Sequence, residues 1–91
     1  MIKQLFDFEI DNIINNINDI VNDKFYLICS WNSNHFIIGK LTNIHTNIYK
    51  SRLDLVHIRY IYRDNGYHNK SPKKRLNIDL NKDIIYKLRF N

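Results

Sequence analysis

The predicted fold is decided by the stretch Asp54-Leu-Val-His-Ile-Arg-Tyr-Ile-Tyr-Arg-Asp-Asn-Gly-Tyr-His-Asn-Lys-Ser-Pro-Lys-Lys-Arg-Leu-Asn-Ile-Asp-Leu80. Its first part predicts a long strand with an apolar face, because β-branched and aromatic residues dominate and alternate: Val56, Ile58, Tyr60 and Tyr62 against His57, Arg59, Ile61 and Arg63. Asp64-Asn65-Gly66 supplies the chemistry of a short hairpin loop closed by glycine. Pro72 cannot donate to a sheet ladder, so we expect the return strand to break near Ser71 and restart around Lys74.

Further strands are expected on both sides of this hairpin. After Lys24, one face of a strand carries Phe25, Leu27, Cys29 and Trp31, and the other carries Tyr26 and Ile28. The next strand starts at His35 and contains Gly39, which in mid-strand predicts a bulge or a bend. Alternating apolar residues over 75–80 and 84–90 predict two more strands, and a short helix is the alternative for the last of them.

The N-terminal segment has a different apolar spacing. It matches one face of a helix over residues 6–22, with these apolar positions: Phe6, Ile10, Ile13, Ile14, Ile17, Ile20 and Val21. Asp7 is a candidate N-cap. Asparagine and isoleucine are poor helix formers, so packing would have to hold this helix in place.

These elements predict one α+β domain over residues 1–91, with a helix at 6–22 and a β-barrel-like body at 25–90. Ninety-one residues are enough for one core without disulfides or metals. The expected architecture is an N-terminal helix packed on a strongly bent five-stranded antiparallel sheet, which is the pattern of an SH3-like barrel.

In Trp31, in the segment from Phe36 through Gly39-Lys40-Leu41 to Ile44, in Val56 to Tyr60 and in Asp64-Asn65-Gly66, the chain resembles Tudor and chromo-barrel domains. The segment Gly39 to Ile44 after an N-terminal helix is also similar to Sm-like proteins, although His45 and Tyr49 stand where those proteins carry Asp and Asn. The Tudor resemblance implies an aromatic cage for methylated lysine formed by Trp31, Phe36 and Tyr60 with Asp64 or Asn65. Aromatic residues at alternating strand positions are the ordinary content of a core, which is the competing interpretation.

Charge is the strongest functional signal in the sequence. The net charge is +5, and it divides into −4 through Asp23 and +9 from Lys24 onward. A basic surface interleaved with aromatic rings suits DNA or RNA, because cations bind phosphates and rings stack on unpaired bases. The predicted nucleic-acid-binding residues are Lys50, Arg52, Arg59, Tyr62, Arg63, Tyr67, Lys70, Lys73, Lys74 and Arg75. The competing interpretation is a solvated polar face that only keeps the protein soluble.

Catalysis has little support. The four histidines match no zinc pattern, Cys29 lies on an apolar strand face, and we expect no metal and no cofactor. One enzymatic alternative is metal-independent RNA cleavage, with His57 or His68 as the base and Arg59, Arg63 or Lys74 stabilising the phosphorane.

A third class is a protein-interaction module, such as a phage or viral inhibitor of a host factor, which would use the isoleucine face of the helix. One cysteine and no apparent signal peptide or apolar span predict an intracellular protein that does not enter the membrane. The absence of alanine and the many Asn, Ile, Lys and Tyr residues indicate an AT-rich genome.

Overall fold

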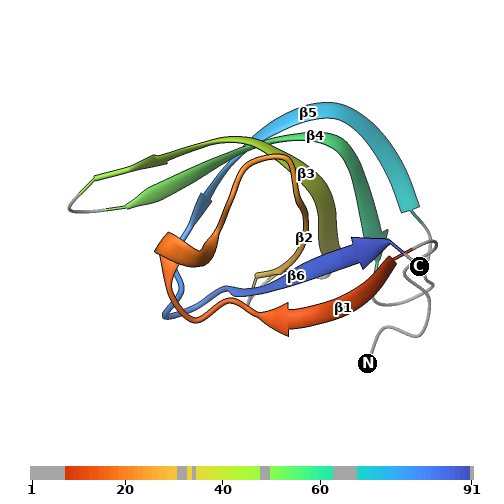
Figure 1. Ribbon diagram of the computed structural model, residues 1–91. Helices are drawn as coiled ribbons and strands as arrows, with labels where there is room; N and C mark the ends of the chain where they lie inside the picture. Colours follow the sequence, from red (N-terminus) through yellow and green to blue (C-terminus); the bar gives the residue numbers. More distant parts are fainter. Residues whose placement is uncertain (1–7, 31–32, 34, 48–49, 63–67, 91) are drawn as a thin grey trace.

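The chain folds into one six-stranded antiparallel sheet with the strand order β1-β6-β2-β3-β4-β5 (Figure 1). The computed structural model describes residues 8–30, 33, 35–47, 50–62 and 68–90, with the backbone alone at 68–72 and 90. The strands are β1 (Phe8–Ile13), β2 (Phe25–Cys29), β3 (His35–Thr46), β4 (Ser51–Tyr62), β5 (His68–Ile78) and β6 (Ile84–Phe90), and a 3-10 turn η1 covers Ile17–Asp19.

The predicted helix at 6–22 is wrong, and with it the α+β class and the five-strand count. The described part of the chain contains no α-helix. Phe8 and Ile10 alternate with acidic residues in β1, which pairs with β6 from Phe8 opposite Phe90 to Ile13 opposite Tyr86. Isoleucine favours strands and asparagine favours turns, and Asn16 caps η1 by accepting a 2.9 Å hydrogen bond from the Asn18 N–H.

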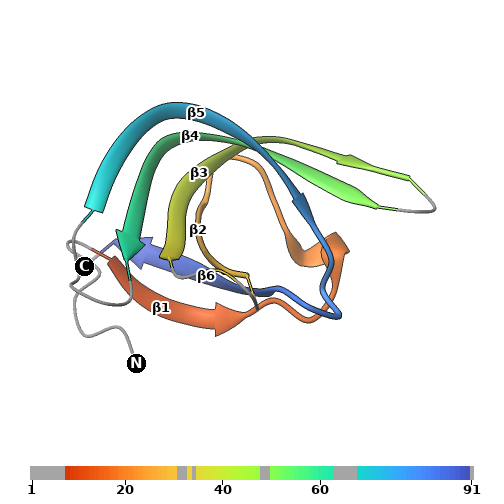
Figure 2. The same ribbon diagram turned by 180° about the vertical axis from the view of Figure 1, so that it is seen from behind.

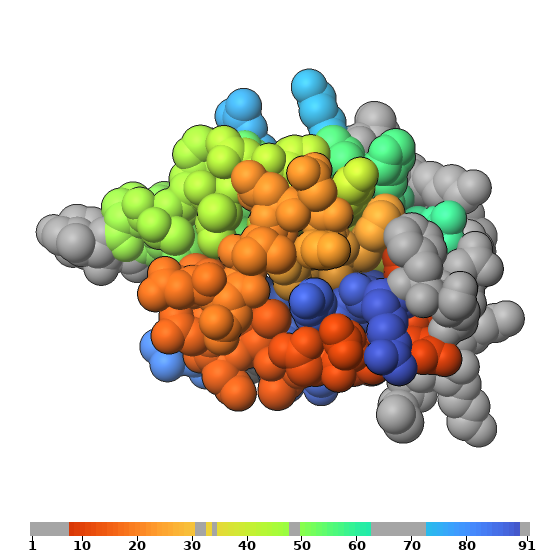
Figure 3. Space-filling view, in the orientation of Figure 1, coloured from red at the N-terminus to blue at the C-terminus, as the bar shows by residue number. Residues whose placement is uncertain are grey.

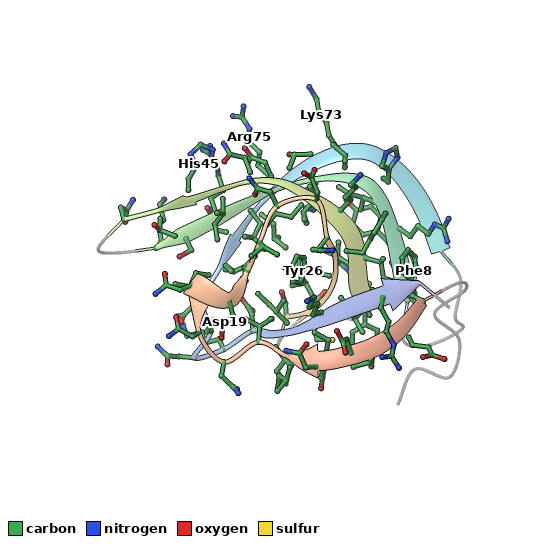
Figure 4. All side chains as sticks on the ribbon, viewed as in Figure 1. Phe8, Asp19, Tyr26, His45, Lys73 and Arg75 are labelled. Atoms are coloured by element: carbon green, nitrogen blue, oxygen red, sulfur yellow. The ribbon has the colours of Figure 1, made fainter. Side chains whose placement is uncertain are left out.

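The sheet curls strongly, so that β3, β4 and β5 arch over β6 and β1 (Figures 1 and 2). The inner face carries the larger core, to which Tyr26, Leu41, Leu53, Leu55 and Ile58 contribute side chains with at most 1% exposure. Tyr26 lies inside the curve (Figure 4), and its hydroxyl accepts a 2.9 Å hydrogen bond from the Val21 N–H. The 14–20 segment adds Ile14 and Ile20 to this core.

A second core cluster lies on the outer face, where Leu27, Ile38 and Leu88 are buried with Phe8 and Ile61. The predicted two-sided pattern of β2 is confirmed, because Tyr26 and Ile28 belong to the inner core and Phe25, Leu27 and Cys29 to the outer one. Near β2, core side chains occupy both faces of the sheet. A binding surface is therefore expected on the strands beyond it, β3, β4 and β5.

The two edges of the sheet are β1 and β5, and no pairing between them occurs among the described residues. The predicted break at Ser71 is wrong, because β5 runs through Pro72 without interruption. Val56 lies opposite Lys73 and Ile58 opposite Ser71. An edge strand tolerates proline because its missing N–H need not serve a second neighbour.

The strand interpretation of the C-terminal segment is confirmed by β6, and the bulge predicted at Gly39 is confirmed by a register shift between Ile38 and Lys40. The predicted turn at Asp64-Asn65-Gly66 lies outside the described residues.

Candidate nucleic-acid interface

Rows of side chains run across β3, β4 and β5 on the outer face of the sheet. They alternate with Leu41, Leu53 and Leu55, which point into the inner core. Register defines four rows: Lys40–Val56–Lys73, Asn43–Asp54–Arg75, His45–Arg52–Asn77 and Ile38–Arg59–Lys70. Each row contains at least one basic residue. We use the name outer basic face for the charged residues of these rows whose side chains are described: Lys40, Arg52, Asp54, Arg59, Lys73 and Arg75.

The bulge at Gly39 and His57 decides which side chains share this face. Val56 and Arg59 are three positions apart, which in a regular strand would put them on opposite faces. His57 absorbs the extra residue with a positive φ of 53°, a conformation in which histidine is several-fold enriched. Arg59 therefore lies on the same side as Arg52 and Asp54.

Gly39 is required at this point by a close approach of strands. A Cβ atom there would lie 3.1 Å from the Cβ and 3.4 Å from the Cδ1 of Leu55. The Leu55 Cβ is fixed by its own backbone, so the strands would have to separate to admit it. The bulge thus depends on glycine at 39 for its packing.

The outer basic face holds five formal cations and one carboxylate among its described side chains, which leaves a formal charge of +4. Neighbouring strands are about 4.8 Å apart and successive rows about 6.7 Å apart. Both spacings are shorter than the Debye length of about 8 Å at physiological salt. The cations therefore act on a polyanion as one field.

Asp54 is the single anion of the face, and two basic groups contact it. The Arg52 Nε lies 3.3 Å from Oδ1, and the His45 Nε2 lies 3.2 Å from Oδ2. The Arg52 contact has the distance of an ion pair without the alignment of a hydrogen bond. The other described acidic residues lie outside β3, β4 and β5, and Arg89 bridges Glu9 at 3.2 Å and Asp11 at 3.9 Å on the far edge.

Lys73 and Arg75 project from the outer side of β5, with His45 on the same side of the molecule (Figure 4). Both cations are exposed. In the space-filling view the light-blue side chains of β5 stand clear of the surface formed by β3 and β4 (Figure 3). A shallow depression of about 500 Å³ lies beside them, and Thr42, Asp54, Val56, Lys73 and Arg75 contribute to its lining.

Of the remaining predicted binding residues, Lys50, Tyr62 and Lys74 are described and are not on this face. Lys74 lies opposite Leu55 and extends over the inner-face Tyr60, and Tyr62 packs beside His35. Lys50 lines a different cavity of about 520 Å³ that also contains Asp79 and Asp83. Arg63 and Tyr67 lie outside the described residues, and of Lys70 only the backbone is described, opposite Arg59.

Two residues of the suggested aromatic cage, Phe36 and Tyr60, are described, and they are not brought together. Phe36 packs with the outer core cluster and Tyr60 with the inner one, so the two rings lie on opposite faces of the sheet. Trp31 and Asp64 lie outside the described residues. The suggested catalytic base His57 is exposed at the bulge, and the side chain of His68 is not among those described.

Sequence reasoning missed Lys40 and Asp54 on the outer face and His35 on the inner one. The available signal for Lys40 was simple alternation along β3, which places it on the same face as Ile38, two residues earlier. The described residues contain no group of three or more His, Cys, Asp or Glu side chains that could hold a metal ion.

No helix in the described part of the chain is long and apolar enough to span a bilayer. Comparison with protein-family models, with curated proteins and with solved structures finds no match to this chain. Its function must therefore be inferred from the geometry and charge of its own side chains.

Proposed function

We propose that the protein is a non-enzymatic nucleic-acid-binding domain that uses its outer basic face to hold the phosphate backbone. The observation that carries the proposal is the alignment of Lys40, Arg52, Arg59, Lys73 and Arg75 in neighbouring rows, with Asp54 as the only described carboxylate on β3, β4 and β5. Phosphate contacts of this kind position a polyanion without reading its sequence.

Charge separation across the sheet supports the same proposal. Glu9 and Asp11 lie on the β1 edge, where Arg89 of β6 contacts both, while Lys73 and Arg75 lie on the β5 edge at the other end of the strand order. A chain with basic residues spread evenly would gain solubility from them but would not generate a directed field. The directed field favours binding over the purely solubilising interpretation.

The alternative of a protein-interaction module relied on an isoleucine face of an N-terminal helix. That segment forms β1 and η1, and Ile14 and Ile20 are buried in the inner core, so the helix on which this alternative relied is absent from the described residues; of its apolar set, Ile13 and Val21 remain exposed. Ribonuclease activity through His57 or His68 gains no support either, since His57 is exposed at the bulge and the side chain of His68 is not among those described.

The test is fluorescence anisotropy with a labelled 20-nucleotide oligothymidylate, comparing Lys73→Glu and Arg75→Glu with Lys82→Glu. Lys82 is exposed in the turn before β6, so its reversal changes the net charge equally but away from the outer basic face. We expect each β5 reversal to weaken binding by about fivefold or more and to lower the slope of log affinity against log salt by about one.

Lys82→Glu should leave both quantities nearly unchanged. Equal losses in all three variants would show that net charge alone drives binding. Absence of binding by the unmodified protein at 50 mM salt would refute nucleic-acid binding itself.

A further inference from the structure

A second group of side chains gathers on the inner face near the start of β3 and the end of β4. The His35 and Tyr60 rings are 5.4 Å apart at 70°, an edge-to-face contact, and the Tyr62 ring lies 5.6 Å from His35. The Lys74 ammonium lies 5.3 Å from the centre of the Tyr60 ring. We call His35, Tyr60, Tyr62 and Lys74 the inner cluster, and all four are half-buried.

Lys74 supplies the positive charge of the inner cluster. No carboxylate among the described residues lies within ion-pair distance of Lys74. Burial, and then the charge of Lys74, lower the pKa of His35, while the Ser33 hydroxyl lies 3.0 Å from its Nδ1. A half-buried ammonium whose contact among the described residues is an aromatic ring is suited to an anion that brings its own planar group.

We propose that the inner cluster binds one unpaired nucleotide of a single strand, with its base against the Tyr60 and Tyr62 rings and its phosphate at Lys74. This inference rests on the proposed function and narrows it from any polyanion to single-stranded nucleic acid. The base takes the place of the Lys74 ammonium over the ring, and the flexible lysine side chain turns to the phosphate.

The position of β5 at the sheet edge connects the two surfaces. Lys73 and Arg75 point to the outer side and Lys74, between them, to the inner side. Because no described strand pairs with the free side of β5, one polynucleotide can cross this edge. Its phosphates then lie on the outer basic face while a base enters the inner cluster. A duplex cannot supply such an unpaired base.

The test separates bases from phosphates by comparing 20-nucleotide oligothymidylate with an abasic 20-mer that has the same number of phosphates. The variants are Tyr60→Leu, which removes the ring, and Tyr60→Phe, which keeps it. We expect Tyr60→Leu to weaken oligothymidylate binding by about 5- to 150-fold, the range for one stacked base, and to leave abasic binding unchanged. Tyr60→Phe should behave like the unmodified protein.

Tyr60 packs against the inner core, so Tyr60→Leu can fail to fold. The ring resonances of Tyr60 and Tyr62 in the unmodified protein provide the second measurement, and oligothymidylate but not the abasic strand should shift them. Equal affinity of the unmodified protein for both strands, or unshifted rings, would overturn the inner-cluster proposal and leave the outer basic face standing. Failure of both strands to bind would refute the proposed function as well.

Discussion

Asp54→Asn is expected to tighten nucleic-acid binding. The carboxylate lies in the second row of the outer basic face, one row from Lys73 and one row from Arg52, and rows are about 6.7 Å apart. A phosphate on either neighbouring row therefore lies about 7 Å from the carboxylate, where two unit charges in water repel by about 0.6 kcal/mol. Physiological salt reduces this to about 0.3 kcal/mol per phosphate.

Relief of repulsion on two such phosphates gives about 0.6 kcal/mol, or roughly threefold tighter binding of a 20-nucleotide single strand at 0.15 M salt. Release of Arg52 from its 3.3 Å contact with Asp54 acts in the same direction. Stability should change by about 1 kcal/mol or less, because the Arg52 and Asp54 side chains are still 36% and 23% exposed, although the contacting Nε and Oδ1 atoms are buried. Anisotropy measures the affinity and urea unfolding the stability.

The matched control is Asp19→Asn, because Asp19 is exposed in η1 and carries the same charge outside β3, β4 and β5. The tightening by Asp54→Asn should shrink as salt rises, since screening removes the repulsion that the substitution relieves. Equal tightening by both variants, or none by Asp54→Asn, would refute the assignment of the binding surface to this face.

Two further predictions concern stability. Gly39→Ala should lower the free energy of unfolding by about 1–3 kcal/mol in urea titrations, because its new Cβ meets the Leu55 Cβ at 3.1 Å. A Leu55→Ala background should not restore this loss, since alanine at 55 keeps the Cβ atom. Full rescue in that background would contradict the packing explanation. The lowered pKa of His35 means that the folded state favours the neutral ring, so stability is present above the unfolded pKa of about 6.5 and declines as pH falls through the folded value. His35→Gln should flatten the decline in the urea midpoint between pH 7 and 5, and an unchanged slope would show that other groups cause it.

Local pattern was sufficient to predict the strands of the body. Alternation over 25–29, 75–78 and 84–90 reflects real burial on defined faces, and Gly39 marks the bulge. The N-terminal segment was misjudged because Ile10, Ile14 and Ile17 fit a helical stripe, whereas the partner that makes β1 a strand is β6, about 80 residues away. Pairing between strands so far apart in the sequence cannot be predicted from the apolar pattern of a short segment.

The candidate surface was predictable in composition and not in arrangement. Strict alternation along β4 puts Val56 on the face of Ile58 and Tyr60, but the bulge at His57 moves Val56 to the outer side with Arg59. Alternation along β5 separates Lys74 from Lys73 and Arg75, which a reading of the basic run as one patch overlooks. A shift of one residue in strand register moves every following side chain to the opposite face of the sheet.

The free side of β5 has a consequence for handling the protein. Unpaired peptide groups along an edge invite a second copy of the chain to add its own strand, and the run Lys73-Lys74-Arg75 opposes this by mutual repulsion between copies, with Pro72 supplying no N–H. At 1 M salt the screening length falls to about 3 Å, and that repulsion is largely lost. A high-salt wash that strips bound polynucleotide from the protein therefore removes, in the same step, the barrier that keeps its molecules from joining edge to edge.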